Sequence, residues 1–360
     1  MKILHITETM ATGVLKYLQE VIEADHYSGA QHLILYSSKR ENTPIDLNKH
    51  FPDSVSLIEM NMNFNSSYAC IQCIKLLHAQ ISKIKPDAIH LHSSIAGFLG
   101  RIVSVCFPKV KVFYTPHGYS FLMTNKSKVI RAVFWTAEFI LSQINGKIIA
   151  CSKSEFRYAN KLSPIRKPFL LENCIKAGPS ISKEKIATSK NIIGVGRLEH
   201  QKNPKLFIEI IAELKKIDPT INAIWIGDGS LKSDCEEQNY ALNAEVNFTG
   251  WLSNAKTIEF LEDSMVFLQT SNWEGLPYSV LEAFSIGLPV VASNIESHRD
   301  LIDSGYICFI SANKKQFVEN ILNLLRNREL CRDVFEKNRK SIERNYANFS
   351  YTINNIYNNK

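Results

Sequence analysis

Short apolar runs alternate with amphipathic stretches along most of the 360-residue chain. In the first half the apolar runs are four or five residues long, and the stretches between them repeat apolar positions with a helical period. Strands that alternate with helices in this way are typical of a doubly wound α/β fold built on a parallel sheet. The predicted strands are residues 3–6, 33–36, 88–91, 110–114 and 147–150, and the predicted helices lie near 14–24, 67–83, 95–105 and 128–143.

The same alternation starts again in the second half, after a stretch up to residue 190 that is rich in Lys and Ser and poor in apolar residues. A chain of this length exceeds what one hydrophobic core usually serves, so two domains are expected. We predict a first domain over residues 1–172 and a second over 173–345. The strands expected in the second domain are 192–195, 223–226, 246–250, 265–268, 288–292 and 307–310, and residues 314–358 are expected to be helical.

Residues 272–293, with the sequence NWEGLPYSVLEAFSIGLPVVAS, combine a loop, a helix and a new strand. This stretch follows one buried strand and enters another, so its helix makes a crossover between parallel strands. Pro277 suits the first helical position because its missing N–H would have no partner there, and Gly287 is placed to end the helix. Glu274 and Gly275 are then left in the loop that enters the helix.

Two carboxylates in this stretch, Glu274 and Glu282, are eight residues apart. On one continuous helix that offset is about 800°, roughly 80° from facing the same way, so the pair is better placed with one member in the loop. The helix start between them offers unpaired N–H groups to an anion, and the carboxylates would then hold hydroxyl-rich groups on either side of it. From spacing alone, a solvated loop residue and a helix-surface charge fit equally well.

The pattern Glu-Gly-x-Pro, with a second Glu seven intervening residues later and then Gly-x-Pro-Val-Val and Ser, resembles the donor site of the family-4 retaining glycosyltransferases (glycosyl transferases group 1). The resemblance implies the GT-B architecture, in which two Rossmann-like doubly wound domains face a cleft. It implies a catalytic Glu274 against the donor sugar and Glu282 on the ribose hydroxyls. It places Gly275, Leu276 and Ser279 at the donor phosphates.

Further landmarks of this family occur in the expected order along the second half. Gly196-Arg197-Leu198 ends a strand, and Lys202 lies near the next helix start, so two cations could meet one diphosphate; two surface cations remain the alternative. The resemblance makes Arg197 and Lys202 ligands of the donor phosphates. It also places Gly250 and Trp251, at the end of the VNFTG strand, near the nucleobase.

In the first half, the loop of residues 8–13 and the residues after strand 110–114 come where such folds bind ligands. Family members carry two adjacent glycines in the first loop, whereas this chain has only Gly13, preceded by Thr12; we keep both as cleft-loop candidates. A lone histidine is more often packed than catalytic. The resemblance nevertheless assigns His117, in Thr-Pro-His-Gly, to the donor sugar at the reaction centre.

His90 and His92 are two residues apart and therefore share one face of their strand. They could form a metal ligand pair, but the sequence shows no third ligand nearby. The chain also has no Asp-x-Asp pair, and the close cysteines Cys70 and Cys73 have no partner pair at metal-site spacing. We therefore expect no metal site, no cofactor and metal-independent activity.

Charge is distributed unevenly between the halves. Residues 1–170 hold 20 Lys and Arg against 11 Asp and Glu, whereas residues 171–360 hold 22 against 24. Such an excess fits an anionic membrane, a phosphorylated lipid acceptor or nucleic acid, and a generally basic surface is the alternative. Within this half, residues 126–144 mix three basic with several apolar residues, which suits an interfacial helix and a core helix equally.

No run approaches the roughly eighteen apolar residues of a spanning helix, and the first apolar run is too short for a signal peptide. We expect a cytoplasmic protein and leave open a peripheral contact with the inner face of the cytoplasmic membrane. Nucleic acid is not expected as a partner.

The resemblance implies transfer of a hexose or N-acetylhexosamine, with retained anomeric configuration, from a nucleotide sugar to a saccharide acceptor. We expect a UDP-linked donor and a lipid-linked acceptor from surface polysaccharide biosynthesis, such as O-antigen, capsule or lipopolysaccharide. It also implies that a C-terminal helix, residues 346–360, packs back on the first domain. Two alternatives are kept: a sugar-nucleotide epimerase of the same fold, and a non-catalytic subunit that binds a nucleotide sugar.

Overall fold

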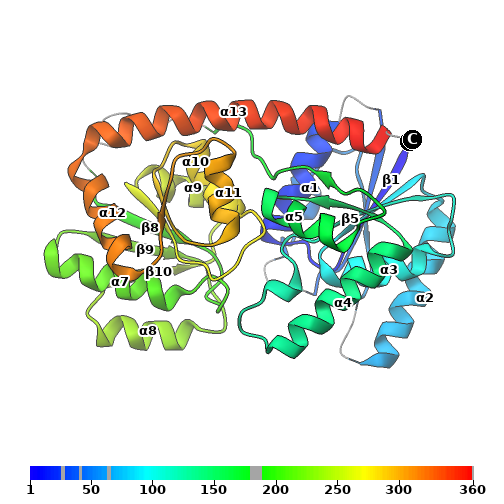
Figure 1. Ribbon diagram of the computed structural model, residues 1–360, viewed down its shortest axis with the longest axis horizontal. Helices are drawn as coiled ribbons and strands as arrows, with labels where there is room; N and C mark the ends of the chain where they lie inside the picture. Colours follow the sequence, from blue (N-terminus) through cyan, green and yellow to red (C-terminus); the bar gives the residue numbers. More distant parts are fainter. Residues whose placement is uncertain (26–28, 40–42, 63–65, 179–188, 359–360) are drawn as a thin grey trace. The chain divides into compact units, whose positions relative to one another are not determined.

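The computed structural model describes residues 1–25, 29–39, 43–62, 66–178 and 189–358. It divides into two compact units, Met1–Asn173 with Asn348–Lys360, and Cys174–Ala347 (Figure 1). The joins expected after residues 172 and 345 lie next to these boundaries. Most of the Lys- and Ser-rich stretch between the domains, residues 179–188, lies outside the described residues.

The first unit contains a seven-stranded sheet in the order β3-β2-β1-β4-β5-β6-β7. Every pairing in it is parallel, as the strand-helix alternation predicts. The two strands missing from the prediction, β3 and β7, are edge strands of only four and two residues. The bounds are β1 (Lys2–Thr7), β2 (Gln31–Tyr36), β3 (Ser56–Glu59), β4 (Ala88–His92), β5 (Lys111–Thr115), β6 (Lys147–Ala150) and β7 (Phe169–Leu170).

The two faces of this sheet are covered differently. Alternate residues of a strand point to opposite faces, so Leu4 and Ile6 lie on one face while His5 and Thr7 lie on the other. The first face joins α2 and α3 in a large apolar cluster, and the second is covered by α1 and the end of the last helix. The helices of this unit are α1 (Thr12–Asp25), α2 (Ser67–Ile84), α3 (Ser94–Ser104), α4 (Lys128–Ile144) and α5 (Lys153–Leu162), with short 3-10 turns at Leu47–His50 and Ser120–Leu122.

The second unit contains a six-stranded parallel sheet in the order β10-β9-β8-β11-β12-β13. Its strands are β8 (Asn191–Val195), β9 (Asn222–Ile226), β10 (Val246–Gly250), β11 (Val266–Gln269), β12 (Val290–Ser293) and β13 (Cys308–Ser311). Its helices are α7 (Pro204–Ile217), α8 (Lys232–Ala241), α9 (Asn254–Glu262), α10 (Tyr278–Ser285), α11 (Glu296–Asp303), α12 (Lys314–Arg326) and α13 (Arg328–Asn358).

In both sheets the strand order reverses once near the middle, between β1 and β4 in the first and between β8 and β11 in the second. The loops at the carboxyl ends of such neighbouring strands run in opposite directions and leave room for a ligand. In the second unit Arg197 and Lys202 follow β8, and Glu274 follows β11.

The predicted helix over residues 314–358 is interrupted at Asn327, which separates α12 from α13. The end of α13 belongs to the first unit. There Ser350 Oγ donates to the carbonyl of Ala24 at 3.3 Å, and Lys111 Nζ donates to the carbonyl of Tyr357 at 3.3 Å. The last turns of the chain therefore complete the first unit.

Two local predictions need correction. Thr12 and Gly13 are the first two residues of α1 and not part of a loop, because Met10 and Ala11 are already buried and the helix follows at once. Pro277 is the N-cap of α10 and not its first residue. Gly287 follows the helix end with φ 86°, as expected for a left-handed glycine stop.

Candidate functional site

The switch point of the second unit holds a pair of opposite charges. Lys202 follows β8 and Glu274 follows β11, and these two strands are paired in the sheet. Lys202 Nζ lies 2.6 Å from Glu274 Oε1, with side chains only 16% and 7% exposed. An ion pair so poorly exposed is screened less by water than a surface pair, so each charge strongly compensates the other.

Glu274 is also held by three uncharged donors. Ser271 Oγ donates to Oε1 at 2.7 Å, Gln269 Nε2 to Oε1 at 3.3 Å, and Gln201 Nε2 to Oε2 at 3.3 Å. Both carboxylate oxygens are therefore engaged, and the side chain has one defined orientation. Sequence reasoning missed these donors because hydroxyl and amide side chains carry no period or charge that singles them out.

Gln201 connects the two loops of this switch point. Its Oε1 accepts a hydrogen bond from Arg197 Nη2 at 3.2 Å, and its Nε2 also donates to the carbonyl of Trp273 at 3.2 Å. Arg197, Gln201 and Lys202 therefore all act on the loop that carries Glu274, directly or through Gln201. The only sequence signal for Gln201 was its position next to Lys202.

Two glycines allow the loops after β8 and β9 to touch. Gly196 and Gly227 have φ 155° and 131°, and a Cβ on Gly227 would lie 2.1 Å from the carbonyl oxygen of Gly196. A side chain at Gly227 would therefore push away the backbone that directly precedes Arg197. The glycine-rich strand ends seen in the sequence are needed for this close approach.

The start of α10 brings together the predicted phosphate-binding residues. Gly275 and Leu276 are buried in the entering loop, and Ser279 lies in the first turn of the helix. Ser279 Oγ is shielded from solvent and has no hydrogen-bond partner within the described residues. A hydroxyl and the unpaired N–H groups of a helix start can together bind an anionic oxygen.

The predicted nucleoside-binding residues lie on α10 and at the end of β10. Glu282 is partly buried on α10, and its Oε1 accepts from Asn254 Nδ2 at 3.2 Å. Gly250 ends β10 with φ 70°, and its carbonyl accepts from the N–H of Gly227 at 2.9 Å. Trp251, directly after it, is exposed.

His298 on α11 is a buried residue of this unit that the sequence did not point to. Its Nδ1–H donates to the carbonyl of Ser293 at 2.8 Å, which leaves Nε2 unprotonated in the neutral ring. Burial lowers the pKa of His298 to about 4, and the charges of Glu274 and Lys202 act on it in opposite directions. It is therefore a neutral imidazole in the neighbourhood of the ion pair.

In the first unit, His117 lies in a turn held in an uncommon conformation. Its φ of 54° is left-handed, which costs a residue with a side chain about 1–2 kcal/mol, and Gly118 follows with φ 100°. Glu155 holds the turn by accepting from Gly118 N at 2.5 Å, and also accepts from Cys151 N at 3.0 Å. Ser152 Oγ caps α5 by accepting from Glu155 N at 3.1 Å.

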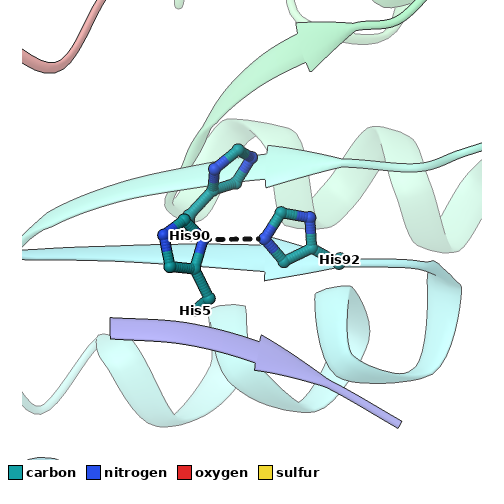
Figure 2. Close-up of side chains that lie close together, drawn as sticks. All are labelled: His5, His90 and His92. Atoms are coloured by element: carbon teal, nitrogen blue, oxygen red, sulfur yellow. Dashed lines mark hydrogen bonds between the residues drawn. The ribbon is translucent and has the colours of Figure 1, made fainter. Parts of the chain in front are cut away.

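His117 is the end of a group of five histidines on one face of the first sheet. Figure 2 shows three of them, His5, His90 and His92, with the hydrogen bond between His5 and His92 as a dashed line. Burial, and then the neighbouring histidines, lower the pKa of each of these three well below 6.5, and burial lowers the pKa of His117 to about 3. His5, His90, His92 and His117 are therefore uncharged at neutral pH.

The structure supplies the third histidine that the sequence did not show for a metal site. One ring nitrogen each from His5, His90 and His92 lies within 4.8 Å of the others, and three neutral imidazoles are a set that Zn²⁺ accepts. However, both ring nitrogens of His90 already have partners, Tyr357 Oη at 2.7 Å and Thr115 Oγ1 at 2.8 Å. The same atoms are thus satisfied by hydrogen bonds within the protein.

Two parallel Rossmann-like sheets with loops gathered at their switch points place the protein among two-domain α/β proteins. Sucrose-phosphate synthase from Thermosynechococcus elongatus has this fold, with a TM-score of 0.84 at 14% identity over 99% of this chain and 98% of that one. At this identity the likeness concerns the fold alone, which is the predicted GT-B architecture.

Sequence comparison shows which known proteins this chain is similar to. Residues 180–341 match the model of the glycosyl transferases group 1. An Escherichia coli UDP-Gal:alpha-D-GlcNAc-diphosphoundecaprenol alpha-1,3-galactosyltransferase is 32% identical over 256 residues, which are 65% of this chain and 64% of the relative. A Klebsiella pneumoniae protein, described as an uncharacterized 41.2 kDa protein in the cps region, is 29% identical over 87% of this chain and 88% of the length of that protein. These matches bear out the predicted resemblance to the glycosyl transferases group 1.

Proposed function

We propose that the protein is a retaining glycosyltransferase that moves a hexose or N-acetylhexosamine from a UDP-linked donor to a saccharide on a lipid diphosphate carrier. The observation that carries the proposal is the Lys202–Glu274 pair, at 2.6 Å, at the switch point of the second sheet. The donor and acceptor classes follow the name of the galactosyltransferase relative.

Glu274 would act on the sugar as the bond to the leaving group breaks. In this step the bond between the sugar C1 and the diphosphate oxygen breaks, and its electron pair leaves with UDP. The acceptor hydroxyl oxygen bonds to C1 on the same face, and its proton goes to a donor phosphate oxygen, so no side-chain base is needed. The sugar carries positive charge in between, which a carboxylate fixed by Ser271 and the two glutamines stabilises without having to reorient.

Lys202 and Arg197 would balance the charge that grows on the diphosphate. Lys202 is ion-paired with Glu274 and Arg197 is hydrogen-bonded to Gln201, so both cations belong to the same network of contacts. Ser279 Oγ and the N–H groups at the start of α10 supply uncharged donors. We propose that these groups replace a metal ion and that Glu282, Gly250 and Trp251 contact the nucleoside.

A test of this proposal needs purified protein, a panel of nucleotide sugars and a synthetic lipid diphosphate that carries GlcNAc. We expect one UDP-sugar to give a disaccharide product whose new linkage has the anomeric configuration of the donor, as read by NMR. An inverted linkage would rule out the retaining mechanism. Conversion of the donor to its epimer without acceptor would favour the epimerase, and donor binding without any turnover would favour a non-catalytic subunit.

We also propose that the first unit contacts an anionic membrane surface through helices α2, α3 and α4. No helix among the described residues is long and apolar enough to cross a membrane. However, α3 packs against both α2 and α4, and all three expose large apolar side chains. On α4, Phe134 and Trp135 pack against the core, while Val129 and Val133 are 73% and 60% exposed. The other exposed apolar residues of the three helices are Tyr68, Ile71, Leu76, Ile95, Phe98, Ile102, Ile130, Phe139, Ile140 and Ile144.

The start of α4 adds charge to this apolar surface, because Lys126 and Lys128 are exposed next to Val129. Apolar side chains beside lysines are the combination that binds the interface of an anionic bilayer. We expect co-sedimentation with vesicles that contain phosphatidylglycerol, weaker binding in high salt, and loss of binding in Val129→Ser/Val133→Ser. Tyr240→Ser is a matched control, since Tyr240 is an exposed apolar residue on α8 of the other unit. Equal binding by both variants would contradict the assignment of this surface.

A further inference from the structure

The five neighbouring histidines on one face of the first sheet, His5, His32, His90, His92 and His117, are not an irregular group. Four of them form a row of contacts across the sheet, from β2 through β1 and β4 to the turn after β5. His32 Nδ1 lies 3.0 Å from His5 Nε2, His5 Nδ1 lies 3.1 Å from His92 Nε2, and His92 Nδ1 lies 3.3 Å from His117 Nε2. Every contact joins Nδ1 of one ring to Nε2 of the next.

The row begins at a buried carboxylate. Asp25, at the end of α1, and His32 are both buried, and His32 Nε2 lies 3.1 Å from Asp25 Oδ2. The two groups are close, although they are not aligned as a full hydrogen bond in this structure. An ionised carboxylate has only acceptor atoms, so it favours the ring of His32 that carries its proton on Nε2.

With the proton of His32 on Nε2, one proton assignment satisfies the whole row. A neutral imidazole has one N–H donor and one acceptor nitrogen, so a proton on Nε2 of His32 makes its Nδ1 an acceptor. His5 must donate to that atom from Nε2, His92 must donate to His5 from Nε2, and His117 must donate to His92 from Nε2. The opposite assignment is also continuous, but it places the lone pair of His32 Nε2 against the carboxylate.

We infer that Asp25, acting through His32, His5 and His92, fixes the tautomer of His117 so that its Nδ1 is presented as a hydrogen-bond acceptor. Such an atom recognises an O–H group, and the substrate class is a sugar whose hydroxyl points at His117. Asp25 and the three inner histidines are positioning residues, because they act through His117 and do not touch the substrate. The role toward a sugar hydroxyl rests on the proposed function, whereas the tautomer does not.

The surroundings of the row support this assignment. His90 lies beside it, with ring centroids 4.1 Å from His92, but both of its nitrogens are used by Thr115 and Tyr357. It therefore does not compete for the nitrogens of the row. Tyr17 on α1 meets His117 and His92 edge-on, at 4.7 and 5.6 Å between centroids, so the rings are confined from the helix side as well.

The tautomers can be measured directly in full-length protein labelled with ¹⁵N-histidine, by two-bond ¹H–¹⁵N correlation at pH 7.5. His117→Gln identifies the resonances of His117 by their loss. We expect wild-type His5, His92 and His117 to carry their protons on Nε2. A proton on Nδ1 of His117 in the wild-type protein would overturn the inference, whatever happens to any variant.

The variant Asp25→Asn tests the cause, because an amide can donate to His32 Nε2 and reverse the row. We expect His117 to lose its preference for the Nε2–H tautomer in Asp25→Asn and to keep it in the control Asp53→Asn, whose side chain is exposed. The exposed His78 should be unchanged in both. An unchanged His117 in a folded Asp25→Asn, or a stoichiometric metal ion bound by His5 and His92 in elemental analysis, would overturn the inference.

Failure of this inference and failure of the proposed function are separate results. If the protein shows the predicted tautomers but transfers no sugar, the tautomer assignment stands and only its role toward a sugar hydroxyl is lost. If the wild-type protein transfers sugar but His117 has the opposite tautomer, the proposed function stands and the tautomer assignment is lost. In an active enzyme, Asp25→Asn should raise KM for the sugar substrate. The affinity of Asp25→Asn for UDP alone should equal that of the wild-type protein.

Discussion

The two switch points of this protein occupy the same place in two similar sheets but differ in their electrostatics. Between β8 and β11, Lys202 and Glu274 form an ion pair of full charges. Between β1 and β4, His5 and His92 are neutral, and burial lowers the pKa of both. A charged pair suits a ligand with charge of its own, such as a diphosphate, whereas neutral rings suit hydroxyl groups. The same topology thus carries two different electrostatic environments.

The largest expected effect is on turnover, from Glu274→Gln. Removing the fixed carboxylate takes away charge stabilisation in the transition state, and loss of one such preorganised group typically costs about 100- to 1,000-fold in rate. Affinity for UDP alone should change little. Single-turnover rates and UDP titrations on the same protein check this.

Glu282→Gln is the matched comparison, because it removes a second carboxylate from the same stretch. It should weaken donor binding by about tenfold and leave turnover nearly intact, since the ribose contact is present before and during reaction. The reverse pattern in the two variants would exchange their roles, and a fully active Glu274→Gln would remove Glu274 from the reaction centre.

A second expected effect is that the two units differ in how much stability they lose at low pH. The unfolded chain titrates histidines near 6.5, while in the folded protein the pKa is about 4 for His298 and about 3 for His117. As the pH falls below about 6.5, these histidines bind protons in the unfolded state but not in the folded state. The free energy of unfolding therefore decreases as the pH falls below 6.5. For the fully buried His298 the loss at pH 5 is about 2 kcal/mol.

The first unit has four histidines with a lowered pKa among its described residues, and the second has one. We therefore expect amide protection in β1 and β4 to fall faster between pH 7 and 5 than in β8 and β11, as measured by hydrogen exchange. His78→Gln, an exposed control, should not change this difference. Equal losses in both sheets would contradict the comparison.

A smaller effect is expected from Lys202→Met. The variant keeps most of the side-chain volume but loses a charge-assisted contact to the diphosphate, worth roughly 10- to 150-fold in donor affinity. Lys205→Met is the control, since Lys205 is a partly exposed neighbour that pairs with Asp234. If Lys202→Met has the donor affinity and rate of the wild-type protein, Lys202 does not contact the donor and serves only to hold Glu274.

The smallest effect should come from metal removal. If cations of the chain carry the diphosphate charge, then dialysis against EDTA should leave the rate unchanged. Recovery of lost activity by Mg²⁺ or Mn²⁺ would place a metal at the donor site. Recovery by Zn²⁺ alone, with altered histidine resonances, would place one in the first unit.

The sequence located the charged switch point because its residues lie in short motifs. Glu274 was found from Glu-Gly-x-Pro and Lys202 from its place after Gly-Arg-Leu, and both are brought together by the pairing of β8 with β11. The donors that orient Glu274 were not found. Ser271 and Gln269 lie within five residues of it, but nothing in their type distinguishes them from ordinary loop residues.

The histidine row was only partly visible. His90 and His92 were seen as neighbours on one strand, and His117 through its resemblance to the family, while His5 and His32 raised no expectation. Their contacts depend on the register of parallel strands, in which His5 lies opposite His90. The exposed face of α4 was also undecided, because an apolar helix does not reveal which side it buries.

The sequence by itself determined most strands of the two sheets, the two-domain plan and the loops that carry the charged residues. These follow from periodicities and spacings within a few residues, which local backbone geometry imposes on any chain. Only the tertiary structure decided that Asp25, His32, His5, His92 and His117 form one row. Parallel strands are joined by long crossovers, so the contacts across them depend on sheet order and register and leave no local pattern in the sequence.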